Sequence, residues 1–250
     1  MWNEPSAGVA VTALDPESPS RQPEPAVVAS VEAGSIGEEL GFEPGDQLLS
    51  INGVRPRDLI DYRYLIVEEE LTLEVRDSAG ELHCVELEKD ADDGLGLEFT
   101  EALFDGLRQC TNRCSFCFID QQPPGHRDSL YLKDDDYRLS FLYGSYLTLT
   151  NLSDSDWERI EQQRLTPLFV SVHATDPDLR SMLLENPKAG KLLQQLQWFA
   201  QRDLQIHAQV VVCPGLNDGD ALLNTLRDLA GFTGVEWPAV LSAAVVPVGL

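Results

Sequence analysis

Three of the five cysteines in this 250-residue chain lie within eight residues, in the segment Cys-Thr-Asn-Arg-Cys-Ser-Phe-Cys at 110–117. Thiolates this close together can bind a metal, but three of them cannot fill the four positions of a tetrahedral zinc site. A fourth ligand for zinc would have to come from His126, His173 or Cys213. A [4Fe–4S] cluster can be held by three cysteines, which leaves one iron open to another ligand. The spacing therefore predicts a metal centre of one of these two kinds, with the ligands Cys110, Cys114 and Cys117.

The rest of the composition narrows the class of protein. The number of cysteines is odd, and the N-terminus has no basic segment followed by an apolar one, so a metal or redox role in the cytoplasm is favoured over disulfides. No apolar run is long enough to predict a membrane span. The net charge is −24, and residues 1–100 carry 23 acidic and 6 basic side chains. A nucleic-acid partner would need a basic face, so none is expected.

The first hundred residues predict a tail followed by a small β-rich domain. Residues 1–25 are rich in Pro, Ser and Glu, and we expect a mobile tail there. Ser35 is a predicted N-cap, and the Asn52–Gly53 pair predicts a tight turn. The alternation of apolar side chains predicts strands at 26–31, 47–51, 70–77, 82–89 and 94–99, with helices at 35–40 and 57–66.

This segment, 26–99, resembles a PDZ domain in its strings AGSIGEELGFEPGDQLLSINGV and GLGLEF. In PDZ domains a Gly-rich loop binds a peptide carboxylate through backbone N–H groups, and the next strand pairs with the peptide. The loop comes first in the common animal order and last here, at Gly94–Phe99, so the resemblance implies a circularly permuted domain. The acidic residues Asp90, Asp92 and Asp93 would repel a carboxylate. A β-rich adaptor that binds no peptide, or a loop that docks on another domain of the same protein, are the alternatives.

The second half of the chain alternates predicted strands with predicted helices. Strands are expected at 146–150, 168–174, 205–212 and 241–248, and helices at 153–164, 176–186, 189–203 and 219–232. Ser153 and Asp156 form a predicted capping box. This alternation is typical of parallel βα units, and the apolar strands suggest that both faces of the sheet are covered. The fold class is therefore α/β: a small β-rich domain followed by a parallel βα domain.

The cysteine segment, with an aromatic residue before its third cysteine, resembles the signature of radical S-adenosylmethionine (radical SAM) enzymes. The resemblance implies an incomplete (βα) barrel in which the three cysteines hold a [4Fe–4S] cluster. The open iron would bind S-adenosylmethionine, and one electron from a flavodoxin- or ferredoxin-type donor would cleave it to methionine and a 5′-deoxyadenosyl radical. That radical would act on a substrate that the resemblance does not name. Phe116 would lie near the adenine.

Further segments, among them CFIDQQPPGHRDSLYLKDDDYRLSFLYG and VVVCPGLNDG, are similar to one subfamily that joins a permuted PDZ domain, a radical SAM core and a domain of unknown function, DUF512. We expect a radical SAM unit at 100–250 that is cut short and lacks DUF512, and such a fragment can be inactive. Many radical SAM proteins carry Gly-Gly-Glu where this chain has 148–151. Backbone carbonyls there, or the Asn151 side chain, would meet the methionine amino group, and ordinary strand and turn residues at Thr148, Thr150 and Asn151 are the alternative.

Other residues have both a functional and a structural interpretation. His173 ends a predicted strand at the expected barrel mouth, where it would bind cofactor or substrate, or serve as a hydrogen-bonded structural histidine. His126 and Cys213 are site candidates or, respectively, a solvated loop residue and a buried free cysteine. The acidic run at 134–136 is a candidate cation site, but a solvated run is the simpler interpretation. An adaptor with a PDZ-type binding module and a structural zinc or Fe–S site is the alternative to the enzyme.

Overall fold

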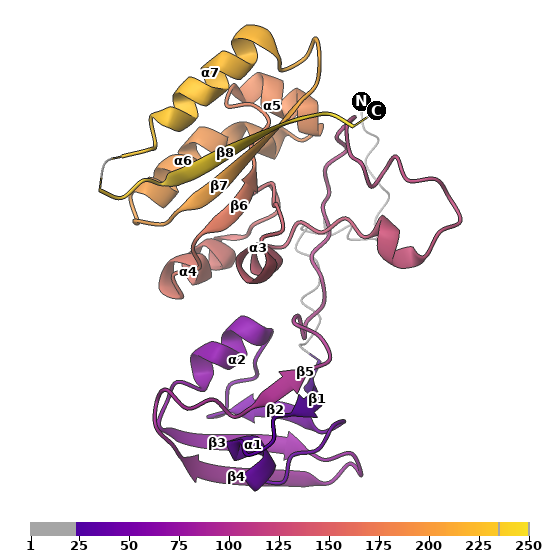
Figure 1. The fold of residues 1–250 in the computed structure, drawn as a ribbon, viewed down its shortest axis with the longest axis vertical. Helices are drawn as coiled ribbons and strands as arrows, with labels where there is room; N and C mark the ends of the chain where they lie inside the picture. The colour runs from indigo at the N-terminus through magenta and orange to yellow at the C-terminus, as the bar shows by residue number, and fades with distance from the viewer. Residues whose placement is uncertain (1–23, 235, 250) are drawn as a thin grey trace, which may run out of the picture. The chain divides into compact units, whose positions relative to one another are not determined.

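The computed structural model describes residues 24–234 and 236–249, and the chain divides into two compact units between Gly106 and Leu107 (Figure 1). Of the predicted tail, residues 1–23 lie outside the described residues. At the start of the described chain, the Glu24 backbone N–H donates to Phe104 O at 2.8 Å. Within the described ranges, no helix is both long and apolar enough to cross a membrane.

The first unit is built on a five-stranded antiparallel sheet in the order β4-β3-β2-β1-β5. Ser35 caps the first helix by accepting a hydrogen bond from Glu38 N, as its residue type predicts, and Asp58 caps the second. The elements are β1 (Ala26–Val31), α1 (Ile36–Glu39), β2 (Gln47–Ile51), α2 (Leu59–Leu65), β3 (Glu70–Arg76), β4 (Leu82–Glu88) and β5 (Leu97–Phe99).

The core of this unit lies on the sheet face that α1 and α2 cover. Leu48, Leu73 and Leu95 are fully buried there, and Tyr62 of α2 packs among them. The strand predicted at 94–99 begins only at Leu97, because the three residues before it form a loop. Gly96 in that loop has φ of 70°, which a residue with a side chain rarely adopts.

The edge strand β4 is largely exposed and carries two glutamates. Its register with β3 places Glu88 directly opposite Glu70, and Glu86 opposite Thr72. Like charges that face each other across two strands repel. The end of the β3–β4 hairpin that lies away from its turn therefore concentrates negative charge.

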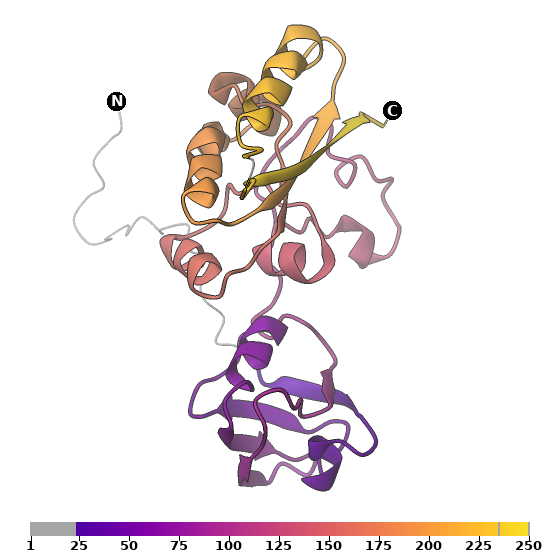
Figure 2. The ribbon, with the colours of Figure 1, turned by 60° about the vertical axis from the view of Figure 1, so that its left-hand side comes forward.

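The second unit contains a three-stranded parallel sheet in the order β6-β7-β8, with α5, α6 and α7 along one face (Figure 2). The predicted capping box is present, with Ser153 and Asp156 bonded to each other's backbone N–H groups at the start of α4. The α-helices and strands are α3 (Tyr137–Tyr143), α4 (Asp154–Gln162), β6 (Leu168–Ser171), α5 (Pro177–Leu184), α6 (Leu192–Ala200), β7 (Ile206–Val212), α7 (Gly219–Ala230) and β8 (Val240–Pro247).

Three sequence expectations for this unit are wrong. The strand predicted at 146–150 is only a single parallel bridge between Leu147 and Val170, because Leu149 takes a left-handed backbone with φ of 61°. β6 ends at Ser171, before His173 turns to the same conformation. Past Val240, β8 is half-buried or exposed along its length, so it is not covered on both faces. The helix α3 has no counterpart among the predicted elements.

Candidate functional site

The three clustered cysteines lie in a segment without helix or strand, and all three are half-buried free thiols. Backbone hydrogen bonds hold this cysteine loop: Cys110 N donates to Lys133 O at 2.7 Å, and Cys117 N to Cys114 O at 3.0 Å. Burial raises the pKa of Cys110 to about 11, and the Asp135 charge adds to this. Burial and the neighbouring cysteines raise the pKa of Cys114 to about 12. Such thiols lose their protons readily only when a cationic metal centre binds the thiolates and neutralises their charge.

Asn112, between the first two cysteines, is a buried residue with four side-chain hydrogen bonds. Its exposed fraction is 2%. Its Nδ2 donates to Cys110 Sγ at 3.3 Å and to Thr148 Oγ1 at 3.0 Å. Its Oδ1 accepts from Thr150 Oγ1 at 3.2 Å and from Asn186 Nδ2 at 2.7 Å. The amide thus joins the cysteine loop to the segment at 148–150 that precedes α4.

Asp135 anchors the far side of this network. Thr148 donates to its carboxylate through the backbone N–H at 2.5 Å and through Oγ1 at 2.6 Å. Asp135 is almost fully buried, and burial raises its pKa while the two hydrogen bonds from Thr148 oppose that shift. Asp136 is buried as well; it caps α3 and pairs with Arg138 Nη2 at 2.7 Å. The expectation of a solvated acidic run is wrong for these two residues, since each has its own buried hydrogen-bond donors.

Arg180 of α5 is fully buried and ties together the backbone around this network. Its guanidinium donates to four carbonyl oxygens, those of Thr148 (2.9 Å), Ser171 (2.8 Å), Val172 (2.8 Å) and Ala189 (2.6 Å). Burial lowers its pKa to about 10, which leaves it a cation at neutral pH. The segment at 148 and the end of β6 are therefore held by one side chain.

Asn151 differs from its neighbours in having an acceptor that is not used. Its Nδ2 donates to Asp135 O at 2.9 Å. Its Oδ1 is buried and has no hydrogen-bond partner, a state shared among the described residues only by Gln195 Oε1. Gln195 in turn donates through Nε2 to Leu149 O at 2.8 Å. A buried acceptor without a donor is costly and is often explained by an unseen water, ion or ligand.

Phe116 and His173, which the sequence places 57 positions apart, are in direct contact. Their ring centroids are 4.8 Å apart in an edge-to-face arrangement. His173 Nδ1 accepts from Val211 N at 3.2 Å, so a hydrogen bond to a cofactor would fall to Nε2. Burial, and secondarily Arg180, lower the His173 pKa to about 3, so the ring is neutral at physiological pH.

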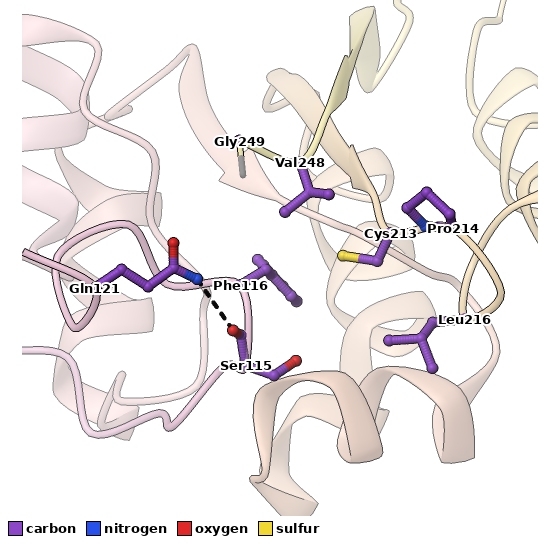
Figure 3. Close-up of a pocket in the computed structure, with 8 residues that line it drawn as sticks. All are labelled: Ser115, Phe116, Gln121, Cys213, Pro214, Leu216, Val248 and Gly249. Atoms are coloured by element: carbon purple, nitrogen blue, oxygen red, sulfur yellow. Dashed lines mark hydrogen bonds between the residues drawn. The ribbon is translucent and has the colours of Figure 1, made fainter.

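A pocket of about 480 Å³ opens beside these rings, at the carboxyl ends of β7 and β8 (Figure 3). The cysteine loop supplies one wall, where Gln121 Nε2 donates to Ser115 O at 3.2 Å. The Cys213 side chain points into the same space as the Phe116 ring (Figure 3). No charged side chain lines the pocket, whose residues are Ser115, Phe116, Gln121, Cys213, Pro214, Leu216, Val248 and Gly249.

The remaining candidates lie apart from this arrangement or have structural partners. His126 is exposed, and its backbone N–H donates to Tyr131 Oη at 3.0 Å. Cys84 is exposed in β4. Asn217 accepts from Cys213 N at 2.7 Å and donates to His173 O at 2.8 Å, so it connects the segments that follow β6 and β7.

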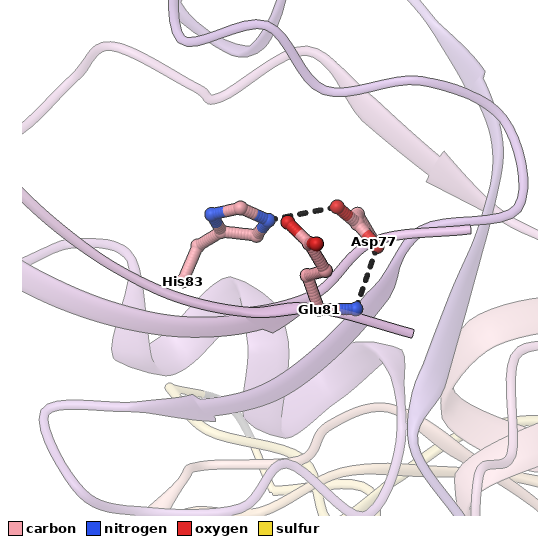
Figure 4. Close-up of side chains that lie close together, drawn as sticks. All are labelled: Asp77, Glu81 and His83. Carbon is pink, nitrogen blue, oxygen red and sulfur yellow. Dashed lines mark hydrogen bonds and ion pairs between the residues drawn. The ribbon is translucent and has the colours of Figure 1, made fainter. Parts of the chain in front are cut away.

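A second group of possible metal ligands lies at the turn between β3 and β4 (Figure 4). The ligand atoms of Asp77, Glu81 and His83 all lie within 4.8 Å of one another, the one such triplet of His, Cys, Asp or Glu in the described chain. His83 Nε2 lies 2.8 Å from Asp77 Oδ2. Asp77 Oδ1 accepts from Ala79 N at 2.9 Å and Glu81 N at 2.8 Å. An ion pair and a hairpin turn account for these contacts.

The residues that connect the predicted site have no such role among the sequence expectations: Asn112, Asp135, Arg180 and Asn186. A signal existed for two of them, since Asn112 lies between two cysteines and Asp135 lies in the acidic run. The other two lie on a helix and at a helix end, where nothing in the local pattern marks them. Of the predicted residues, the network joins Cys110, Thr148 and Thr150, and it reaches Asn151 through Asp135. A separate ring contact joins Phe116 and His173.

Comparisons with known proteins identify two domains in this chain. A family model described as a Radical SAM-like domain matches residues 89–242, and a PDZ domain model matches residues 27–77. None of the curated proteins matches the chain. Among solved structures, the PDZ domain of an SdrC-like protein from Listeria innocua is 12% identical over 32% of this chain and 99% of that one, with a TM-score of 0.28.

Proposed function

Since this chain belongs to the family of Radical SAM-like domains, we propose that Cys110, Cys114 and Cys117 hold a [4Fe–4S] cluster that binds S-adenosylmethionine. The observation that carries the proposal is the position of three half-buried free thiols on a loop beside the carboxyl ends of parallel strands. Such a cluster, once reduced, would supply the electron that cleaves the sulfonium C–S bond, giving methionine and a 5′-deoxyadenosyl radical. The radical would then remove a hydrogen atom from a substrate.

The number of thiols supports a cluster over a single zinc ion. A structural zinc site needs four protein ligands, and the loop offers three cysteines. Three thiols with a fourth position open to a small-molecule ligand also match the donor set that a [4Fe–4S] cluster accepts.

The pocket beside Phe116 is the proposed place for the adenosyl part of S-adenosylmethionine. That part of the molecule is uncharged, and the pocket is lined by uncharged side chains, four of them apolar or aromatic: Phe116, Pro214, Leu216 and Val248. The neutral His173 ring contacts Phe116 edge to face. A one-electron donor of flavodoxin or ferredoxin type would be the protein partner of the second unit.

Asn151 is the proposed acceptor for the methionine amino group. The carbonyl oxygens of Thr148 and Leu149 already accept from Arg180 and Gln195, respectively. Asn151 Oδ1 has no donor. The hydroxyls of Thr148 and Thr150 would act on the cofactor through Asn112, since that is where their hydrogen bonds lead. Asn151→Ala should weaken S-adenosylmethionine binding with the iron content unchanged.

Anaerobic reconstitution with iron and sulfide tests the proposal. We expect about four irons per chain, broad absorbance near 400 nm, and an electron paramagnetic resonance signal that changes when S-adenosylmethionine is added. With dithionite, 5′-deoxyadenosine should be released. Cys114→Ala should lose the cluster, whereas Cys84→Ala, which removes the exposed thiol of β4, should keep it.

The alternative is a PDZ-type adaptor with a structural metal, and it gives a different result. A colourless protein with one zinc per chain, whose zinc also depends on Cys213 or a histidine, would overturn the cluster. A full cluster whose signal does not change with S-adenosylmethionine would support ligation by the three cysteines but contradict binding of S-adenosylmethionine. A changed signal without release of 5′-deoxyadenosine would contradict only the proposed radical chemistry.

A further inference from the structure

We propose that Asn112 sets the reduction potential of the cluster by donating a hydrogen bond to the sulfur of Cys110. The proposal rests on the proposed function, because it concerns the same three cysteines. In the described chain, Cys110 is the one loop cysteine whose Sγ has a side-chain amide donor, Asn112 Nδ2 at 3.3 Å. That distance is within the range for a hydrogen bond to sulfur.

The orientation of the Asn112 amide is dictated by its other partners. Asn186 Nδ2 can only donate, so the atom 2.7 Å from it must be the Asn112 oxygen. The nitrogen then faces Cys110 and Thr148. A flipped amide would place two NH₂ groups against each other and a carbonyl oxygen against the sulfur. The donor on the sulfur side is therefore fixed by a residue on the opposite side of the amide.

Asp135 fixes the second hydrogen of the same amide. Thr148 gives its hydroxyl hydrogen to Asp135 Oδ2 at 2.6 Å, so its Oγ1 receives the Asn112 hydrogen at 3.0 Å. One Nδ2 hydrogen thus goes to Thr148 and leaves the other for the sulfur. Lys133 Nζ donates to Asn112 O at 3.0 Å and holds the backbone of the same residue. With an exposed fraction of 2%, Asn112 does not exchange these partners for water.

A hydrogen bond of this kind changes the charge balance at the cluster. Reduction adds a negative charge that spreads onto the cysteine sulfurs. A fixed N–H group stabilises the reduced form more than the oxidised form, and so raises the reduction potential. Removal of the donor should therefore make the cluster harder to reduce. The three cysteines would remain in place.

A redox titration followed by electron paramagnetic resonance tests this in the reconstituted full chain. Asn112→Ala should keep about four irons and shift the midpoint potential to a more negative value than that of the wild type. Asn112→Asp, nearly identical in shape but without the N–H donor, should shift it in the same direction. Gln122→Ala is the matched control, because it removes a side-chain amide of the same loop that donates to a carbonyl oxygen, that of Phe118, and not to a sulfur. Its potential should equal that of the wild type.

Each result has a distinct meaning. A wild-type potential in Asn112→Ala with full iron, or an equal shift in Gln122→Ala, would overturn the role of the N–H group. If both Asn112 variants lose iron, electron–nuclear double resonance on the wild-type protein tests the proposal instead. The spectrum should show a proton that is coupled to the cluster and exchanges with deuterium. The absence of that proton would overturn the proposal. A wild type without any cluster would instead contradict the proposed function.

Discussion

The Phe116 ring meets the His173 ring edge-on, with centroids 4.8 Å apart and planes at 68°. One ring belongs to the cysteine loop and the other follows β6. The His173 backbone has φ of 61°, and its carbonyl accepts from Asn217 Nδ2 at 2.8 Å. The loop that carries the thiols therefore rests on a residue that β7 and its following turn hold in place.

His173 should make this unit less stable in acid. Its pKa is about 3 in the folded protein and near 6.5 in the unfolded chain, so the unfolded state binds the extra proton between these values. The free energy of unfolding therefore contains its full contribution from neutral His173 above pH 6.5, and this contribution is lost as the pH falls toward 3. Between pH 7 and 5 the cost is about 2 kcal/mol, given that the folded pKa lies well below 5.

His173→Asn is the variant for this measurement. Asparagine tolerates the left-handed backbone, and its oxygen can accept the Val211 N–H in place of Nδ1. Urea unfolding at pH 7 and pH 5 should show a steeper fall for the wild type than for the variant. The acidic groups common to both proteins cancel in this difference, and so does the nearby Arg180. Parallel curves would contradict a buried neutral histidine.

Arg180→Met should destabilise the second unit strongly. The change leaves four buried carbonyl oxygens without their donors and removes the cation that favours the charged form of Asp135. Loss of a buried charge partner costs about 3–5 kcal/mol. Fluorescence of Trp157 and Trp198, which pack against each other in this unit, reports the transition in urea. Arg180→Lys keeps the charge but not the fork of donors, and should lose less. Equal losses in the two variants would show that the retained charge does not stabilise the unit, and would contradict the role given to the cation.

Gly37→Ala should destabilise the first unit alone. A Cβ at Gly37 would lie 2.6 Å from Leu95 O and 2.7 Å from Leu97 Cδ2, closer than atoms can approach. Overpacking of this kind costs about 1–3 kcal/mol. Gly94→Ala is the control, since its Cβ would meet nothing nearer than Gly96 N at 4.0 Å. Hydrogen exchange of β1 and β5 in the full chain should speed up in the first variant and not in the second. Equal hydrogen-exchange rates in the two variants would contradict the predicted steric clash at Gly37.

The PDZ domain should bind a free C-terminal peptide weakly, and binding should strengthen with salt. β5 pairs with β1 on one side only within the described sheet, which leaves the other edge for a peptide. The exposed carboxylates of Asp90, Asp92 and Asp93 precede the loop and repel a peptide carboxylate. At physiological salt the screening length is about 8 Å, so this repulsion is only partly screened.

Fluorescence anisotropy of labelled peptides with the full chain, at several salt concentrations, measures this. We expect dissociation constants in the high micromolar range or weaker. Tight binding that weakens with salt would contradict the sign of the electrostatics. No binding at any salt would favour a loop that docks within its own protein.

Local patterns predicted those elements whose causes are local. The Ser35 cap, the capping box of α4 and the β3–β4 hairpin each depend on residues a few positions apart. The strand at 146–150 failed because contacts from distant residues hold Leu149 in a left-handed conformation, among them the hydrogen bond from Gln195, 46 positions away.

The same limit applies to the candidate site. The cysteine spacing identified the loop, and the ligands it suggests remain a prediction. Asn112 could not be recognised as a hub, since three of its four side-chain partners lie 36 to 74 positions away. Asp135 and Asp136 looked solvated because a run of carboxylates does not reveal that Thr148 and Arg138 will cover it.

The glutamates of β4 bear on how this protein behaves at high concentration. An exposed edge strand offers unpaired backbone groups to any other strand that approaches. Glu86 and Glu88 alternate along this edge, and Glu70 lies opposite Glu88. A second copy of the hairpin that added itself in register would bring these carboxylates together without counter-charges. The repulsion that slightly weakens the hairpin thus works against edge-to-edge aggregation.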